Sequence, residues 1–253
     1  MSTSAVALAV LSVCAWIEIA AVAVGGFFVQ AALRLVTLPF DPGRRVAGRF
    51  LRLMAVAASG LHPLWRFAVH GRLPRGVAPR TVVVSNHESH ADVFLISRLP
   101  WEMKWLAKAE LFFIPFIGWC MWLAGDIRVK RGARTSAQEA MARCRLWLER
   151  GVPVAIFPEG TRSETGEMGP FKDGAFRLAI EARAALLPVA VAGTRRALQK
   201  HSWRFGRARA FVTVGEPIPT DGLTMSDVPA LKARTRAAID ALRATLVPLV
   251  DLS

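Results

Sequence analysis

Residues 81–92 read TVVVSNHESHAD, and this stretch decides the fold class of the chain. Its first four residues, TVVV, form a run that is short and apolar enough for a buried strand. The stretch becomes polar at Ser85, Asn86 and His87, and apolar residues at helical spacing resume after Asp92. A strand that ends in a polar turn before a helix places side chains at the carboxyl edge of a sheet, where open α/β folds bind ligands. We therefore expect the functional site at this turn.

Two interpretations of His87 and Asp92 are open at this point. In the first, His87 is a general base and Asp92 holds its imidazole in the productive tautomer. In the second, Ser89-x-x-Asp92 is a capping box that closes the start of a helix, and His87 is a polar loop residue. The spacing alone does not decide between them, so the decision depends on the rest of the chain.

The composition limits the classes of partner and compartment. The chain has 253 residues, enough for one domain of enzyme size plus an appendage. Its 33 Lys and Arg against 19 Asp and Glu give a net charge of +14, which favours anionic lipid, acidic carrier proteins, phosphorylated substrates or nucleic acid as partners. Three scattered cysteines without a CxxC pair indicate neither a disulfide framework nor a zinc site.

Residues 5–33 are apolar, with Glu18 as the only charge. This length predicts a membrane span or a re-entrant hairpin at Gly25 and Gly26. A secretory signal peptide fits poorly, because the first 33 residues hold no Lys or Arg. Basic residues follow this segment, namely Arg34, Arg44, Arg45, Arg49 and Arg52. By the positive-inside tendency they place the remainder of the chain on the cytoplasmic side, which we expect to be that of a bacterial inner membrane. Residues 46–65 predict an amphipathic helix that either lies on the membrane or covers the core of the domain.

The remainder of the chain alternates strand and helix patterns, which predicts an α/β domain with a mostly parallel sheet flanked by helices. We accordingly divide the chain into a membrane-associated helical region, residues 1–64, and an α/β domain, residues 65–253. The expected strands are 67–70, 81–85, 104–107, 126–130, 152–157, 187–192 and 209–214. The expected helices are 92–98, 116–123, 136–149, 175–184 and 226–247.

A second polar motif follows the strand expected at 152–157 and reads FPEGTRS over residues 157–163. Arg162 offers a planar fork of donors suited to a phosphate, and Thr161 adds a hydroxyl. Gly160 lets the backbone turn tightly. Glu159 could pair with Arg162 or accept a hydrogen bond from a substrate hydroxyl. The alternative is a surface turn with a Glu–Arg pair.

The two motifs together resemble the glycerolipid acyltransferases, the family of 1-acylglycerol-3-phosphate acyltransferases. Two further blocks stand in the order typical of that family, GDIRVKR at residues 125–131 and LPVAVAG at residues 187–193. The resemblance covers residues 65–217. One departure is visible: the family often has a bulky residue between the Ser and Asp of the first motif, where this chain has His90 and Ala91.

The resemblance implies a reaction and a set of residue roles. It implies transfer of a fatty acyl chain from acyl-CoA or acyl carrier protein to 1-acylglycerol-3-phosphate at a membrane, giving phosphatidic acid. His87 would be the general base and Asp92 would orient it. The acceptor's glycerol phosphate would be bound by Glu159, Gly160, Thr161 and Arg162, with help from Arg128 and from cations that could reach it, such as Lys108 and Lys172. The thioester is already activated, so no cofactor, metal or covalent enzyme intermediate is implied.

Other readings remain. A Ser or Cys hydrolase would need a nucleophile in a recognisable setting, and the chain has no G-x-S-x-G motif. A non-catalytic binding module could use a basic cluster as a polyanion surface, although the apolar amino-terminal segment favours lipid or an acidic carrier protein over nucleic acid. That cluster is Arg195, Arg196, Lys200, Arg204, Arg207 and Arg209.

The aromatic run at 111–123 would line an acyl groove, dip into the bilayer or form a packed core helix.

Overall fold

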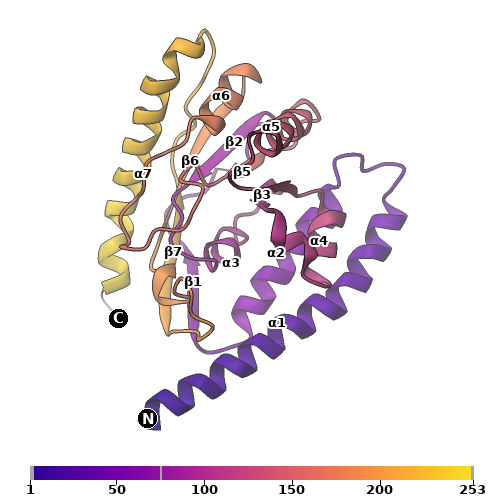
Figure 1. The fold of residues 1–253 in the computed structure, drawn as a ribbon, viewed down its shortest axis with the longest axis vertical. Coiled ribbons are helices and arrows are strands. Elements are labelled where there is room, and N and C mark those ends of the chain that lie inside the picture. Colours follow the sequence, from indigo (N-terminus) through magenta and orange to yellow (C-terminus); the bar gives the residue numbers. More distant parts are fainter. Residues whose placement is uncertain (1–2, 75, 252–253) are drawn as a thin grey trace.

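The core of the chain is a seven-stranded sheet in a computed structural model that describes residues 3–74 and 76–251 (Figure 1). The strand order is β1-β7-β6-β2-β5-β3-β4. All neighbouring strands are parallel except β6 and β7, which confirms the mostly parallel sheet. The strands are β1 Trp65–Val69, β2 Thr81–Ser85, β3 Lys104–Lys108, β4 Ile127–Val129, β5 Val154–Ile156, β6 Ala185–Ala192 and β7 Ala208–Val214.

Helices cover both faces of the sheet. Along β2, Val82 and Val84 face one core and Val83 faces the other, as the two-residue period of a strand requires. Helices α5, α6 and α7 pack on the first core, and α1, α2 and α3 pack on the second. Their bounds are α1 Thr3–Val36, α2 Arg45–Gly60, α3 Asp92–Ile96, α4 Ile117–Ala124, α5 Arg134–Glu149, α6 Gly174–Glu181 and α7 Val228–Asp251. Short 3₁₀ turns are η1 Ala109–Phe113, η2 Thr194–Arg196 and η3 Met225–Asp227.

The amino-terminal segment is one continuous helix, so the hairpin at Gly25 and Gly26 is wrong. Gly26 faces the side chain of Met54 on α2, and a β-carbon there would require the end of that side chain to move. The glycine therefore lets two helices approach closely and does not break α1. Within the described residues, α1 alone has the length and apolarity to cross a membrane.

Helix α1 is attached to the domain near its middle and toward its carboxyl end. The amide of Gln30 donates to the carbonyls of Ala47 and Cys120, and Trp16 Nε1 donates to the carbonyl of Trp203. Helix α2 buries Arg52 and Met54 between α1 and the domain, so its inner face covers the core. The proposed division at residue 64 stays a prediction.

The aromatic run at 111–123 spans the end of η1 and all of α4 except its last residue. Phe112 and Cys120 are buried, as a packed helix requires, whereas Phe113 is 74% exposed and Trp119 is 44% exposed. Trp119 lies edge-on to Phe27 of α1, with the ring centroids 5.4 Å apart. The exposed side of α4 therefore continues the apolar surface of α1.

Candidate active site

The turn after β2 brings His87 and Asp92 together at the carboxyl edge of the sheet. His87 Nδ1 lies 2.7 Å from Asp92 Oδ2, and the imidazole is largely buried. A carboxylate on Nδ1 selects the tautomer that carries its proton there, because a carboxylate only accepts hydrogen bonds. Nε2 is then the unprotonated nitrogen, which is the form that a general base needs.

Asp92 also organises the turn itself. The full capping box of Ser89 and Asp92 is not formed, because the N-cap of α3 is Ala91 and Ser89 Oγ accepts from the Ala91 N–H instead. The Oδ2 atom of Asp92 accepts from the backbone N–H of Glu88 at 2.8 Å and of Ser89 at 3.0 Å. Its Oδ1 accepts from the hydroxyl of Thr194, the first residue of η2. With both oxygens engaged and no exposed surface, the Asp92 carboxylate is fixed in place before any substrate binds.

Glu159 holds the backbone of His87. Its Oε1 accepts from the His87 N–H at 2.8 Å, and its Oε2 accepts from the Gly169 N–H at 2.8 Å. The Ser163 N–H donates to the His87 carbonyl at 2.8 Å. The 157–163 loop therefore hydrogen-bonds both the N–H and the carbonyl of His87. This geometry favours a positioning role for Glu159, and the expected role toward the acceptor stays a prediction.

Arg162 and Gly160 stand on the same loop. Arg162 is partly buried, and its guanidinium makes no hydrogen bond or ion pair with the residues that the structure describes, so it does not pair with Glu159. Burial first, and then the charge of Arg131, lowers the pKa of Arg162. Gly160 has φ +69°, and a β-carbon there would lie 2.7 Å from Lys172 Nζ, so the turn requires glycine. Thr161 is exposed beside them.

The other predicted phosphate ligands are engaged elsewhere. Lys108, at the end of β3, pairs with Glu110 at 3.4 Å. Arg128, on β4, places its guanidinium 5.2 Å from the ring centroid of Trp122. Both lie at the same sheet edge as His87, but their recorded partners are not site residues. Their roles in phosphate binding stay predictions.

Glu88 is a buried carboxylate for which the sequence suggested no role. Its Oε2 accepts from the Gly193 N–H at 3.1 Å, and its Oε1 lies 3.7 Å from Arg243 Nη2 on α7. Burial first, and then the charge of Asp92, raises the pKa of Glu88 to about 7. Arg243 and the backbone donors oppose this shift. Glu88 therefore connects the turn after β2 to the carboxyl-terminal helix α7.

Three more residues shape the site without having been predicted to do so. Asn86 exchanges two hydrogen bonds with the backbone of Val191, at 2.9 and 3.0 Å, which joins the turn to β6. Thr194 follows β6 after one glycine, so its position near the end of a strand could have indicated a site residue from the sequence. The partner of Arg243 could not be found in this way, because α7 shows only an ordinary amphipathic pattern.

The arrangement defines a class of site: an imidazole base oriented by a carboxylate, beside an unpaired guanidinium, at the carboxyl edge of a parallel sheet. Comparison with known proteins agrees with that class. Residues 66–192, half of the chain, match the family model described as Acyltransferase. The chain belongs to this acyltransferase family.

Several similar proteins are 1-acyl-sn-glycerol-3-phosphate acyltransferases. The 1-acyl-sn-glycerol-3-phosphate acyltransferase alpha of Homo sapiens is 37% identical over 197 residues, covering 77% of this chain and 69% of that protein. The chloroplastic 1-acyl-sn-glycerol-3-phosphate acyltransferase of Arabidopsis thaliana is 36% identical over 159 residues, covering 62% of this chain and 44% of that protein. The chain spans about half the length of this plant relative and of a Chlamydomonas reinhardtii relative, of which it covers 51%.

A solved structure supports the fold. The crystal structure of the 1-acyl-sn-glycerophosphate acyltransferase PlsC from Thermotoga maritima superposes with a TM-score of 0.71 at 22% identity. The superposition covers 94% of this chain and 98% of that one. The long amino-terminal helix and the sheet therefore belong to a fold that is already known.

Proposed function

We propose that this chain transfers a fatty acyl group from an acyl thioester to the free hydroxyl of 1-acylglycerol-3-phosphate, producing phosphatidic acid. The observation that carries the proposal is the 2.7 Å contact between His87 Nδ1 and Asp92 Oδ2, which leaves Nε2 as a base. The names of the relatives supply the acceptor, because geometry alone specifies a hydroxyl and an anion.

The reaction needs one proton carrier. Nε2 of His87 takes the proton of the glycerol hydroxyl while that oxygen attacks the thioester carbonyl carbon. Asp92 stabilises the imidazolium that forms. The tetrahedral intermediate then collapses, the carbon–sulfur bond breaks, and the imidazolium returns the proton to the thiolate. An ester and a thiol result, and no covalent enzyme intermediate, metal or cofactor is required by this sequence of steps.

Arg162 is the residue that we assign to the acceptor phosphate. Its guanidinium is unpaired among the described residues and can bind a phosphate through two parallel hydrogen bonds. Lys172 adds a second cation to the same turn, since its Nζ lies against Gly160. A phosphate held here orients the glycerol so that its hydroxyl meets His87, which is a positioning effect.

We further propose that the chain binds the membrane through α1 and the exposed side of α4, with the site on the cytoplasmic face. The outer face of α1 is apolar, with Ile17 and Phe28 each 63% exposed. A contiguous exposed apolar surface of this kind is typical of a membrane or protein contact. The lysolipid acceptor resides in the same membrane, so this surface would bring the enzyme to its substrate.

The test is acyl transfer from a radiolabelled acyl thioester to lysophosphatidic acid in vesicles, with His87→Ala as the inactive variant. His70→Ala is the matched control, because His70 is exposed and lies outside the site. We expect product with wild type and the control, and none with His87→Ala, while all three sediment with vesicles.

Other lysophospholipids run in parallel, because a His–Asp pair can activate the hydroxyl of any lysolipid that reaches it. Transfer only to another lysolipid would keep the mechanism and overturn the named acceptor. No transfer to any acceptor, with vesicle binding intact, would favour the non-catalytic binding module.

A further inference from the structure

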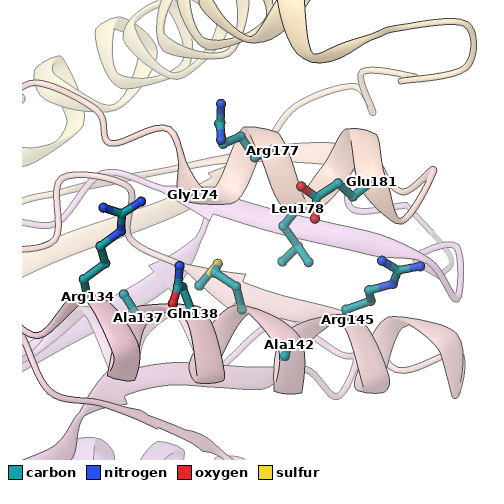
Figure 2. A pocket seen from close by; sticks show the side chains of 10 residues that line it. Arg134, Ala137, Gln138, Ala142, Arg145, Gly174, Arg177, Leu178 and Glu181 are labelled. Atoms are coloured by element: carbon teal, nitrogen blue, oxygen red, sulfur yellow. The ribbon is translucent and has the colours of Figure 1, made fainter.

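An open groove runs between α5 and α6, and its lining includes none of the residues of the His87 site (Figure 2). Its volume is about 550 Å³. Leu178 and Met141 contribute apolar surface, and Figure 2 shows Leu178 pointing from α6 toward α5. Three arginines, Arg134, Arg145 and Arg177, contribute charge, against the single carboxylate of Glu181. The groove therefore has an apolar floor, and the charged side chains that line it carry a net positive charge.

The groove lies on the side of the sheet opposite α1 (Figure 1). If α1 contacts the membrane, this side faces water and is open to a soluble partner. One end of the groove is close to the reaction. Helix α6 begins two residues after Lys172, whose Nζ lies against Gly160, and α5 begins three residues after Arg131, which is near enough to Arg162 to lower its pKa.

The spacing of the arginines selects the kind of ligand. Arg134 and Arg145 are eleven positions apart on α5, or roughly 16 Å along a helix axis. Because Arg145 is held by Glu149 at 3.0 Å and stands this far from Arg134, the positive charge is spread along α5, which suits a ligand with distributed charge better than one compact phosphate. A helix with an apolar stripe and carboxylates distributed along its flanks fits better, since it can use the floor and the separated charges together.

Two of the three arginines hold no close ion-pair partner, although the charge of Arg177, after that of Lys232, lowers the pKa of Asp173. The side chains of Arg134 and Arg177 are exposed and form no ion pair within the described part of the chain, whereas Arg145 pairs with Glu149 at 3.0 Å. Charges that are exposed and unpaired in the free protein lose little when they meet an acidic partner.

We infer that the α5–α6 groove docks an acidic helix of an acyl carrier protein, so that the thioester on its flexible phosphopantetheine arm reaches His87 around the carboxyl edge of the sheet. This inference rests on the proposed function, and it names the form in which the acyl donor arrives.

The test compares two donors, acyl carrier protein and coenzyme A charged with the same acyl chain, on the full chain in detergent. The variant Arg134→Glu with Arg177→Glu should raise the KM for acyl carrier protein about tenfold or more, and leave the kinetics with acyl-CoA unchanged. The control is Arg143→Glu with Arg234→Glu, which reverses two exposed charges outside the groove and should change neither donor's KM.

Each outcome has a definite meaning. An equal loss with both donors, no loss with either, or a wild type that uses only acyl-CoA would overturn the groove assignment and leave the acyltransferase proposal standing. Failure of wild type with both donors would instead reject the proposed function. Should the charge-reversal variant misfold, Arg134→Ala with Arg177→Ala replaces it, with a smaller donor-specific rise in KM expected.

Discussion

The imidazole of His87 stacks on the phenyl ring of Phe157, with the ring centroids 4.0 Å apart and the planes inclined by 14°. Phe157 is in turn backed by Trp105 at 5.6 Å, and the guanidinium of Arg52 lies 5.5 Å from the centre of the Trp105 ring. The edge of the imidazole is therefore fixed by Asp92 and its face by an aromatic stack that reaches α2.

The stack predicts a catalytic effect for Phe157→Leu. An aromatic face stabilises a cation by about 1 kcal/mol, and His87 becomes a cation only during the reaction. We expect kcat to fall about fivefold with KM for both substrates nearly unchanged, and Phe157→Tyr to retain most of the activity. Steady-state kinetics decide the matter, and a loss confined to KM would show that Phe157 contacts substrate instead.

The hydroxyl of Thr194 predicts a second effect on the same base. It donates to Asp92 Oδ1, and a hydrogen bond to a charged group contributes about 1.5–3 kcal/mol. Thr194→Val keeps the shape and removes the donor, so kcat should fall roughly ten- to a hundredfold. Thr194→Ser keeps the donor and should stay near wild type. Equal activity of the two variants would remove Thr194 from the mechanism.

The His–Asp contact and the parallel sheet could be predicted because both depend on short, local patterns. A β-branched run followed by a polar turn specifies where a strand ends, and the five positions from His87 to Asp92 form one compact turn. The antiparallel pairing of β6 and β7 can be predicted only from the absence of a long helix between these two strands. A parallel pair requires a crossover, and only η2 and a loop connect these strands.

The rest of the site depends on contacts between distant segments, which local patterns do not encode. Both oxygens of Glu159 accept from backbone groups, because sheet order brings β5 beside β2, whereas its role toward the acceptor stays a prediction. Likewise, Gly25 and Gly26 allow a re-entrant hairpin by sequence, and only the position of Met54 explains Gly26 within a continuous helix.

Arg162 predicts a change in acceptor selectivity. Arg162→Ala should raise the KM for lysophosphatidic acid by ten- to a hundredfold, because the phosphate loses a bidentate partner worth about 1.5–3 kcal/mol. Arg162→Lys should recover only part of this, since an ammonium cannot form the planar fork. Monoacylglycerol, which lacks the phosphate, serves as the control acceptor. If both acceptors suffer equally, Arg162 acts on the base or the donor and not on the phosphate.

Glu88 predicts a dependence of stability on pH. Its pKa is raised from 4.5 to about 7, chiefly by burial and then by Asp92, so the folded chain binds a proton there more tightly than the unfolded chain. The corresponding stability is complete below pH 4.5 and is lost as the pH rises through 7. At 1.36 kcal/mol for each unit of pKa, the loss amounts to roughly 3 kcal/mol.

The measurement is the free energy of unfolding of wild type minus that of Glu88→Gln, determined with denaturant in one detergent from pH 4.5 to pH 8. Glutamine does not titrate, so this difference should decline by roughly 3 kcal/mol over the range. Glu181→Gln, at an exposed glutamate of α6, provides the matched control and should give a nearly flat difference. A Glu88 difference that stays level or rises with pH would mean that Arg243 and the backbone donors outweigh burial, and that the carboxylate is charged throughout.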